Sequence, residues 1–270
     1  PPPQVWYFAA GSVEAAQRVL AALGLRGAIR ADFLEEYVLE SKILGSGLTS
    51  EVRWATSKFG RCGIAAKCYK VGGDNVREDT VKSSLEKELR VLVALQNHPN
   101  VIKFHGLFRF NGEEDPAAKF CLALELCLTD LIRHAQHKEY SEQASKPVMR
   151  DVLSGLKHMH SLRIVHRDIK PLNLMLRRNG TVVIVDFGLA CWLDDEVAIK
   201  KACGSAGFCA PEIVRKHGCC AKSDVWSLGS SLYYLLFHSV PFGGKDPKSM
   251  LTNTMHGQLN SDIPGFKELS

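Results

Sequence analysis

The stretch VHRDIKPLN at residues 165–173 decides how the rest of the chain is interpreted. It places a His, an Arg, an Asp, a Lys and an Asn within eight residues, and apolar runs lie on both sides. A solvated loop rarely needs that mixture, whereas a site that moves a highly charged group does. The stretch therefore predicts a group-transfer site.

Length and composition indicate a globular chain. Its 270 residues are enough for one large domain or two small lobes, and 46% apolar and 23% charged residues are ordinary values. The net charge of +5 suits anionic ligands such as nucleotides, but it is too small to indicate a nucleic-acid partner. No apolar run reaches the ~18 residues that a membrane span needs. We therefore expect neither nucleic-acid binding nor a membrane span.

The nine cysteines form no CxxC pair. Their scatter among apolar neighbours predicts small buried hydrophobes in a reducing compartment, which favours a cytoplasmic location. A second interpretation is a zinc site at His217, Cys219 and Cys220. No second ligand pair lies at finger spacing, which weakens that alternative.

Hydrophobic patterning predicts a first half made of a sheet with one helix. A helix at 12–23 precedes the main pattern, so residues 1–34 are interpreted as an extension. Apolar residues recur at helical spacing over 80–96. The predicted strands are 37–44, 51–57, 62–70, 101–110 and 119–127.

The second half is predicted to be mostly helical. Residues 146–162 place apolar side chains on one helix face, and residues 223–238 are apolar nearly all round, which indicates a central, buried helix. Between them, strands at 172–176 and 181–187 form a short hairpin.

Several charged residues have the pattern of a phosphate site. The glycines of GSG at 45–47 would let backbone N–H groups approach phosphates, although a plain hairpin turn explains them equally well. Lys67 ends an apolar strand, and an inward-facing Lys is costly unless it is paired. Glu88 on the following helix is the predicted partner, and Glu86 is its rival.

Asn173 and Asp186 are predicted to hold magnesium. Asp186 follows the strand VVIV, thirteen residues after Asn173, and a short hairpin would bring the two side chains together. Mg²⁺ prefers one or two protein oxygens together with phosphates and water.

These stretches, in this order and at these spacings, resemble the eukaryotic protein kinase family. GSGLTSEV resembles the Gly-rich loop, IAAK the Lys-bearing strand, HRDIKPLN the catalytic loop, DFG the metal loop and APE the end of the activation segment. The resemblance covers about residues 37–265. It implies an α+β, two-lobed fold: a small lobe at 35–127 with an antiparallel sheet and one helix, and a mainly helical large lobe at 128–270.

The resemblance also implies ATP, Mg²⁺ and a protein substrate that carries a Ser or Thr hydroxyl. Asp168 would orient that hydroxyl and accept its proton, and Lys170 would neutralise the transferred phosphoryl group. Lys67 would hold the α- and β-phosphates and pair with Glu88. The family's apolar spine would contain Leu92, Phe104, His166 and Phe187.

The nucleotide would contact residues from several strands. Val52 and Ala65 would cover one side of the adenine and Met175 the other. The backbone of Glu125 and Cys127 would form the hinge behind a Leu124 gatekeeper. The implied nucleotide-binding residues are Leu44, Gly45, Ser46, Gly47, Val52, Ala65, Lys67, Leu124, Glu125, Cys127, Met175 and Asp186.

Two features favour the Ser/Thr type. Lys170 lies two residues after Asp168, and Ser205 stands where such kinases usually carry Thr. GFCAPEIV and KSDVWSLG are most similar to the calcium/calmodulin-dependent group and its plant and protist relatives. Since the chain has no EF-hand pattern, any regulatory calcium sensor is expected outside it.

The activation segment departs from the family pattern, because residues 189–204 contain no Ser, Thr or Tyr. Arg167 normally grips a loop phosphate. We hypothesise that Asp194, Asp195 or Glu196 pairs with Arg167 instead, so that the enzyme needs no loop phosphorylation. The alternative is that this acidic run is a solvated turn.

The chain begins without Met and stops at FKELS, so we expect a fragment that lacks the family's last helices. The Arg that usually pairs with Glu212 would then be missing, and an orphaned buried carboxylate costs about 3–5 kcal/mol. The alternative function is a kinase-like module that binds nucleotide or a partner without phosphoryl transfer. The complete set of Lys67, Asp168, Asn173 and Asp186 favours an active enzyme.

Overall fold

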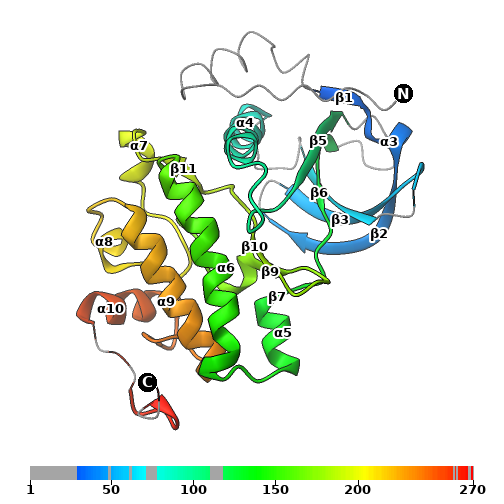
Figure 1. Cartoon of the computed structure of the whole chain (residues 1–270). Helices are drawn as coiled ribbons and strands as arrows, with labels where there is room; N and C mark the ends of the chain where they lie inside the picture. Colours follow the sequence, from blue (N-terminus) through cyan, green and yellow to red (C-terminus); the bar gives the residue numbers. More distant parts are fainter. Residues whose placement is uncertain are drawn as a thin grey trace. The chain divides into compact units, whose positions relative to one another are not determined.

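The computed structural model describes residues 29–47, 50–60, 63–70, 78–109, 118–257, 259, 261–266 and 269. The chain divides into two compact units (Figure 1). The smaller contains Pro1–Asn75 and His105–Leu124, and the larger contains Val76–Phe104 and Glu125–Ser270. The helix expected at 12–23 lies outside the described residues, and the lobe boundaries at 34 and 127 stay a prediction.

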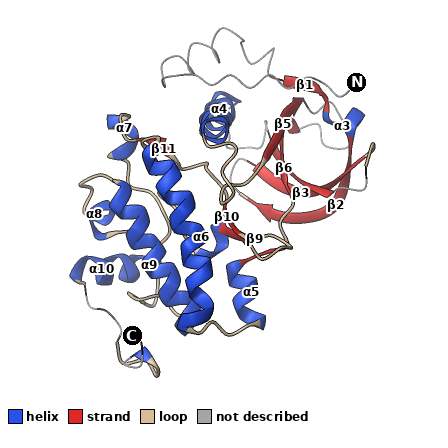
Figure 2. Cartoon of the chain, in the orientation of Figure 1, coloured by secondary structure: helices blue, strands red, loops and turns tan. Residues whose placement is uncertain are grey.

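A six-stranded sheet forms the smaller unit (Figure 2). Its order is β1-β5-β6-β4-β3-β2, and β2, β3 and β4 are antiparallel neighbours, as the sequence predicted. Within this sheet one strand was not predicted: β1 pairs in parallel with β5 and belongs to the stretch interpreted as an extension. The strands are β1 Ile29–Asp32, β2 Tyr37–Ser46, β3 Ser50–Ser57, β4 Gly63–Lys70, β5 Phe104–Arg109 and β6 Ala118–Glu125.

One face of this sheet forms the core of the smaller unit. Side chains alternate across a strand, so alternate residues of β3, β4 and β6 point to the same face. Phe33, in the short helix α3 (Phe33–Glu36), stacks on Tyr37 at 4.9 Å, and Phe108 meets both rings edge-on. The core residues are Phe33, Tyr37, Ala55, Ile64, Ala66, Cys68, Phe108, Cys121 and Ala123.

Helices dominate the larger unit (Figure 2), which confirms the predicted α+β fold class. They are α4 Glu78–Ala94, α5 Leu131–His137, α6 Glu142–Ser161, α7 Glu196–Ile199, α8 Pro211–Val214, α9 Ala221–Phe237 and α10 Pro247–His256. The start predicted for α6 was wrong by four residues. Ser141 caps this helix, because its hydroxyl accepts a hydrogen bond from the N–H of Ala144 at 3.1 Å.

The helix expected beside the sheet, α4, groups with the larger unit. The segment that follows it is hydrogen-bonded to β10 (Val182–Ile184). The N–H of Ile102 donates to the carbonyl of Ile184 at 3.1 Å, and the N–H of Ile184 donates to that of Asn100 at 3.0 Å. Since these bonds follow directly after the helix, they attach its C-terminal end to the larger unit.

Short strands place the loops of the larger unit. β7 (Thr129–Asp130), β9 (Leu174–Leu176) and β10 form a three-stranded sheet, and β8 (Ile164–Val165) pairs with β11 (Cys191–Trp192). A 3-10 turn at Pro171–Asn173 replaces the start of the strand predicted at 172–176. The catalytic stretch therefore runs from β8 through this turn into β9.

α9 is the buried helix that the sequence predicted. Four of its serines are buried, and the hydroxyls of two of them bond to its own backbone. The hydroxyl of Ser227 donates to the carbonyl of Ser223 at 3.0 Å, and that of Ser231 to the carbonyl of Ser227 at 2.8 Å. Because these polar groups are satisfied within the helix, α9 can be covered on most sides by its neighbours.

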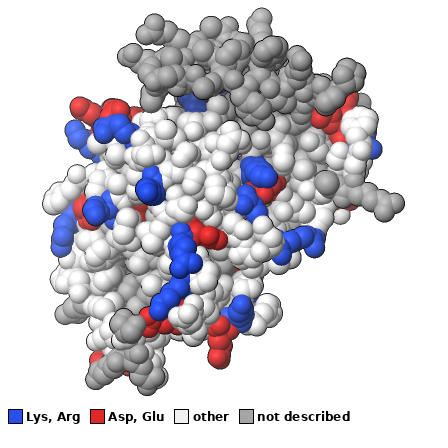
Figure 3. Space-filling view, viewed as in Figure 1, with Lys and Arg blue, Asp and Glu red and all other residues white. Residues whose placement is uncertain are grey.

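Charged residues are dispersed over the visible surface. In Figure 3, basic and acidic side chains are interspersed across the described part of this face. The mild net charge of +5 is therefore not gathered in one place on the described part of this face. Among the residues that the structure describes, no helix is long and apolar enough to cross a membrane.

Candidate active site

The loop that follows β8 has a strained backbone held by a buried carboxylate. Arg167 has a φ of 69°, in the left-handed region that non-glycine residues rarely adopt. Asp224 at the start of α9 is 1% exposed, and its two oxygens accept the N–H groups of His166 and Arg167, each at 2.9 Å. His160 Nε2 donates to the same carboxylate at 2.8 Å. Asp224 thus fixes the backbone directly before Asp168.

Three side chains named in the sequence analysis meet around Asp168. Lys170 Nζ lies 2.8 Å from Asp168 Oδ2. The hydroxyl of Ser205 donates to Asp168 Oδ1 at 2.8 Å and accepts from Lys170 Nζ at 2.7 Å. Asn173 Nδ2 donates to the carbonyl of Asp168 at 2.9 Å and to Oδ2 at 3.2 Å. The carboxylate is therefore oriented by three side chains from two segments.

Asn173 and Asp186 fit a magnesium site in the chemistry of their donors. The amide nitrogen of Asn173 is committed to Asp168, which leaves its amide oxygen as the atom suited to a hard cation. The N–H of Val185 donates to the Asn173 carbonyl at 3.1 Å and so connects this residue to the chain just before Asp186. Asp186 is exposed, with a φ of 60°. One amide oxygen and one carboxylate match what Mg²⁺ takes from a protein.

Glu88 points into the larger unit and Glu86 does not. Glu88 is 3% exposed, whereas Glu86 forms an i,i+4 ion pair with Arg90 at the surface of α4. A Cβ built on Gly188 would lie 3.4 Å from Asp186 Oδ1 and 3.6 Å from Glu88 Oε2. The carboxylate of Glu88 therefore reaches the metal loop. The Lys67–Glu88 pair stays a prediction.

In the smaller unit, the expected nucleotide residues share one face of the sheet. Val52 lies opposite Lys67 in the β3–β4 ladder, and Trp54 lies opposite Ala65. Their neighbours in sequence form the core, so these four side chains point to the other face. By the same alternation Leu124 in β6 lies on that face, because Ala123 is in the core. Lys67 is 9% exposed.

The glycine stretch forms the end of the β2–β3 hairpin. Gly45 pairs with Val52 and Ser46 with Glu51, next to the predicted contact Leu44. The N–H of Gly47 donates to the carbonyl of Ser50 at 2.8 Å. A Cβ on Gly45 would meet nothing within 4 Å. The backbone here is accessible, as a phosphate-binding loop requires.

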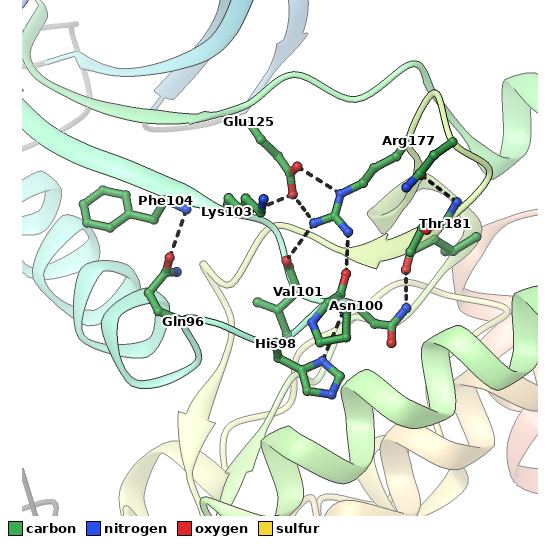
Figure 4. Close-up of polar contacts among 12 residues, drawn as sticks. Gln96, His98, Asn100, Val101, Lys103, Phe104, Glu125, Arg177 and Thr181 are labelled. Atoms are coloured by element: carbon green, nitrogen blue, oxygen red, sulfur yellow. Dashed lines mark hydrogen bonds and ion pairs between the residues drawn. The ribbon is translucent and has the colours of Figure 1, made fainter. Parts of the chain in front are cut away.

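Arg177 holds Glu125 at the end of β6 by a network that the sequence did not predict (Figure 4). Its guanidinium donates to Glu125 Oε2 at 2.9 Å and to Oε1 at 2.6 Å, and also bonds the carbonyls of Pro99 and Val101. The N–H of Lys103 donates to Glu125 Oε1 at 2.9 Å, and the N–H of Glu125 donates back to the Lys103 carbonyl at 2.9 Å. Because the N–H of Glu125 already donates to Lys103, its carbonyl is the backbone group suited to a hinge contact.

Cys127 and Met175 complete the predicted nucleotide residues of the larger unit. Both are half-buried. Burial, and then the charge of Glu125, raises the pKa of the Cys127 thiol to about 12. Met175 lies in β9, opposite Val183 of β10 and Asp130 of β7. The thiol is therefore protonated at neutral pH, and only its backbone suits the predicted hinge role.

The activation segment is held differently from the hypothesis. Arg167 Nε donates to the carbonyl of Leu189 at 2.7 Å, and another guanidinium nitrogen donates to that of Ala198. Asp194 pairs with Arg163 instead, and this pairing lowers the pKa of Asp194. The N–H of Leu193 donates to the Arg163 carbonyl at 2.7 Å, which places Asp194 beside Arg163. The expected pairing of Arg167 with the acidic run was wrong.

The next two residues of that run have other environments. The side chain of Asp195 accepts the N–H of Ala198 at 2.9 Å and caps α7. Glu196 is exposed in the first turn of this helix, where a negative charge is favourable. The run therefore begins a helical turn and is not simply a solvated turn.

Glu212 is not an orphaned carboxylate. The hydroxyl of Ser223 donates to Glu212 Oε1 at 2.6 Å, and Glu212 is only half-buried. The expected penalty was wrong for this reason.

Gly204 brings its backbone close to the catalytic loop. It has a φ of 101°, and a Cβ built on it would lie 2.8 Å from the Arg167 carbonyl. The end of the activation segment at Gly204, called the substrate-side segment below, thus approaches the catalytic loop through main-chain atoms.

The spine residues of the larger unit are mostly buried together. Leu92, His166 and Phe187 are each at most 1% exposed, and Phe104 is half-buried. The rings of His166 and Phe187 lie 5.4 Å apart. His166 Nε2 donates to the carbonyl of Val185 at 3.0 Å, so the catalytic loop and the metal loop are joined here.

The zinc interpretation was wrong. Among the described residues, no group of three or more His, Cys, Asp or Glu side chains is arranged to hold a metal ion. His217 is exposed, and Cys219 packs in an apolar cluster away from Cys220, which is exposed. The pKa of Cys203 is raised by burial, which agrees with an inert thiol at that position.

Asp224 is the residue that the sequence interpretation missed. It lies in α9, which the sequence analysis describes as apolar nearly all round. That description overlooked Asp224, the one buried carboxylate among the described residues of this helix. The signal was present: a buried charge is costly unless partners satisfy it, so a lone Asp in a buried helix indicates such partners.

Comparisons with known proteins identify the family of this chain. The family model described as "Protein kinase domain" matches residues 38–270. Ribosomal protein S6 kinase 2 alpha of Gallus gallus is 32% identical over 229 residues, which cover 83% of this chain and 29% of that protein. Ribosomal protein S6 kinase alpha-1 of Homo sapiens is also 32% identical, over 83% of this chain and 30% of that protein.

A third relative is a calcium-dependent protein kinase, in agreement with the resemblance seen in the sequence. Calcium-dependent protein kinase 4 of Plasmodium berghei is 31% identical over 234 residues, which cover 85% of this chain and 43% of that protein. The chain spans less than half the length of each of these relatives. It belongs to the protein kinase domain family, and it is a serine/threonine kinase domain.

Proposed function

We propose that this chain transfers the γ-phosphate of ATP to a Ser or Thr hydroxyl of a protein substrate, without phosphorylation of its activation segment. The observation that carries the proposal is the arrangement of Lys170, Ser205 and Asn173 around the Asp168 carboxylate. Protein kinases act mainly by positioning the reactants and by stabilising the charge of the transition state. The four side chains supply both effects.

Each of these residues has a defined task in the proposal. Asp168 accepts the proton of the substrate hydroxyl at its carboxylate, and Ser205 keeps that carboxylate in place. Lys170, 2.8 Å from Asp168, supplies positive charge where the phosphoryl group moves. Asn173 and Asp186 would hold Mg²⁺, which when bound would neutralise phosphate charge.

The nucleotide contacts are proposed from the sheet face and the hinge. In the smaller unit, Val52, Ala65 and Leu124 form an apolar face, and Lys67 supplies a cation on it. Glu88 is the proposed partner of Lys67. The backbone of residues 45–47 is proposed to approach the phosphates, and the backbone of 125–127, with Met175, the adenine.

Independence from loop phosphorylation rests on how Arg167 is used. Its guanidinium is already engaged by the carbonyls of Leu189 and Ala198, both in the activation segment. In a phosphorylated kinase a loop phosphate takes that role. Residues 189–204 contain no hydroxyl that could carry one. Backbone carbonyls therefore order the segment in this proposal.

The test uses chain purified from a bacterial host that lacks protein kinases. The protein should transfer radioactive γ-phosphate to a generic Ser/Thr protein substrate without prior activation. Asp186→Asn and Asp168→Asn should each remove transfer, and Asp194→Asn should not. If the wild type binds ATP but transfers nothing, the chain is a nucleotide-binding module. If an upstream kinase is required, the independence from phosphorylation is wrong while the transferase function stands.

We also propose a cytoplasmic location and a regulatory region outside this chain. The eight described cysteines are free thiols, which suits a reducing compartment. The relatives are more than twice as long as the segment they share with this chain, which leaves room for regulatory segments. Fractionation of cells that express the tagged full-length protein tests the location.

A further inference from the structure

Two cysteines that the proposed reaction does not use are packed against each other. Cys191 lies in β11, and Cys219 lies in the loop before α9. Both belong to one apolar cluster, and each thiol shifts the pKa of the other. They are 6% and 8% exposed. The cluster consists of Val165, Cys191, Ala210, Ile213 and Cys219.

The sulfur of Cys219 also lies beside a fixed cation. Arg167 donates to the carbonyl of Ala198, and the carbonyl of the next residue, Ile199, accepts the N–H of Cys219 at 2.9 Å. The positive charge of Arg167 lowers the pKa of Cys219. A cation held at this place favours a thiolate over a thiol.

The titratable and charged groups that face Cys219 are Cys191, Arg167, Asp224 and Cys203. The hydrogen bond from Cys191 lowers the pKa of Cys219 to about 7, with help from Arg167 and against burial and Asp224. The same hydrogen bond, followed by burial, raises the pKa of Cys191. Near neutral pH, Cys219 is therefore the sulfur of this pair that ionises more readily.

We propose that Cys219 and Cys191 are a site of oxidation by hydrogen peroxide, which converts them to an intramolecular disulfide. The proposal goes beyond phosphoryl transfer and does not depend on it. Hydrogen peroxide is small and neutral, so a sulfur with little exposed surface next to exposed residues suffices. The disulfide would join the start of the activation segment to the loop before α9.

The chemistry balances with peroxide as the oxidant. The Cys219 thiolate attacks one peroxide oxygen, the O–O bond breaks, and the leaving hydroxide takes up a proton to form water. Cys219 is then a sulfenic acid. The Cys191 sulfur attacks the Cys219 sulfur, an S–S bond forms, the S–O bond breaks, and hydroxide leaves as water with the Cys191 proton. Two thiols and one peroxide give one disulfide and two waters.

Other thiols of the chain serve as internal comparisons. Cys68 and Cys121 have sulfurs 3.8 Å apart, but both are at most 1% exposed, and burial raises the pKa of Cys121 well above its usual range. That pair lacks access to solvent, and its Cys121 resists ionisation. Cys220 is exposed but lies outside the apolar cluster. A reaction governed by exposure alone would select Cys220 instead.

The experiment treats the reduced chain with hydrogen peroxide, alkylates the remaining thiols and maps the peptides by mass spectrometry without reduction. A peptide pair joined through Cys191 and Cys219, lighter by two hydrogens, is expected before Cys220 is modified. Iodoacetamide labelling of Cys219 in untreated protein should rise about tenfold per pH unit at acidic pH and level off above about 7.

Variants separate the proposal from simple surface oxidation. Cys220→Ser should form the disulfide at the wild-type rate. Cys191→Ser should stop at a sulfenic acid on Cys219, which a cyclic 1,3-diketone traps. If Cys191→Ser does not fold, the wild-type peptide map and labelling profile still decide. The proposal is wrong if Cys191 and Cys219 are recovered alkylated while Cys220 is oxidised, or if Cys219 is joined to a different cysteine.

Discussion

Replacing Asp224 by Asn should weaken both the fold and the reaction. The carboxylate accepts hydrogen bonds from the N–H groups of His166 and Arg167 and from the ring of His160. An amide has one accepting oxygen and one donating nitrogen. In either orientation its NH₂ group therefore faces one of the two backbone N–H groups, and a buried donor loses its acceptor.

The size of the effect follows from these contacts. An unsatisfied buried donor costs about 1–3 kcal/mol, and the bonds that remain lose the ionic part of their strength. The φ of 69° at Arg167 depends on the same carboxylate, so the loop would relax toward an ordinary conformation. We expect the free energy of unfolding to fall by about 2–4 kcal/mol, out of a typical 5–15. If the displaced Asp168 raised the activation free energy by about 2 kcal/mol, kcat would fall about thirtyfold.

Urea denaturation and steady-state kinetics of the same preparations measure the two effects. The matched control is Asp194→Asn, which removes an exposed carboxylate of the same chemistry and should leave the denaturation midpoint unchanged. The reasoning is refuted if Asp224→Asn unfolds at the wild-type urea concentration with an unaltered kcat. A fall in stability with a normal kcat would refute only the link from Asp224 to the catalytic loop.

Three further outcomes are expected. Ser205→Ala removes a charge-assisted hydrogen bond worth about 1.5–2 kcal/mol, so kcat should fall about 10- to 30-fold. The control Ser205→Thr should keep a kcat near that of the wild type, and an unchanged kcat in Ser205→Ala would contradict this prediction. Arg177→Ala removes the bidentate partner of Glu125, so KM for ATP should rise about tenfold with kcat within about twofold, and a change confined to kcat would argue against a hinge role. Burial, and then the charge of His158, lowers the pKa of His98 below its usual 6.5. The unfolded chain therefore binds more protons below that pH, so stability should fall as pH drops through about 6.5 and should fall less in His98→Asn. If the urea midpoints of the wild type and of His98→Asn change equally with pH, His98 is not the cause.

The parts of the site that are local in sequence could be predicted. Asp168, Lys170 and Asn173 come from one short loop, so spacing alone brings them together. Strand alternation likewise predicted that Lys67 ends an apolar strand with its side chain away from solvent. In each case the period of the element decides the direction of the side chain.

The partners of charged side chains could not be predicted in the same way. Arg163 and Arg167 are four residues apart, and both were able to reach one acidic run. The structure selects Arg163 because a backbone hydrogen bond from Leu193 sets the path of the loop. Ser223 satisfies Glu212 for a similar reason: its helix passes close to α8. Such choices depend on tertiary structure, which no local period encodes.

The contact at Gly204 has a consequence for molecules that bind the substrate-side segment. A Cβ built on Gly204 would lie 2.8 Å from the Arg167 carbonyl, so there is no room for a side chain between this backbone and the loop of Asp168. A side chain can change rotamer to absorb a small shift, but two backbones in contact cannot. An inhibitor that displaces the segment at Gly204 would therefore misalign the proton acceptor without occupying the nucleotide site or touching any reacting group.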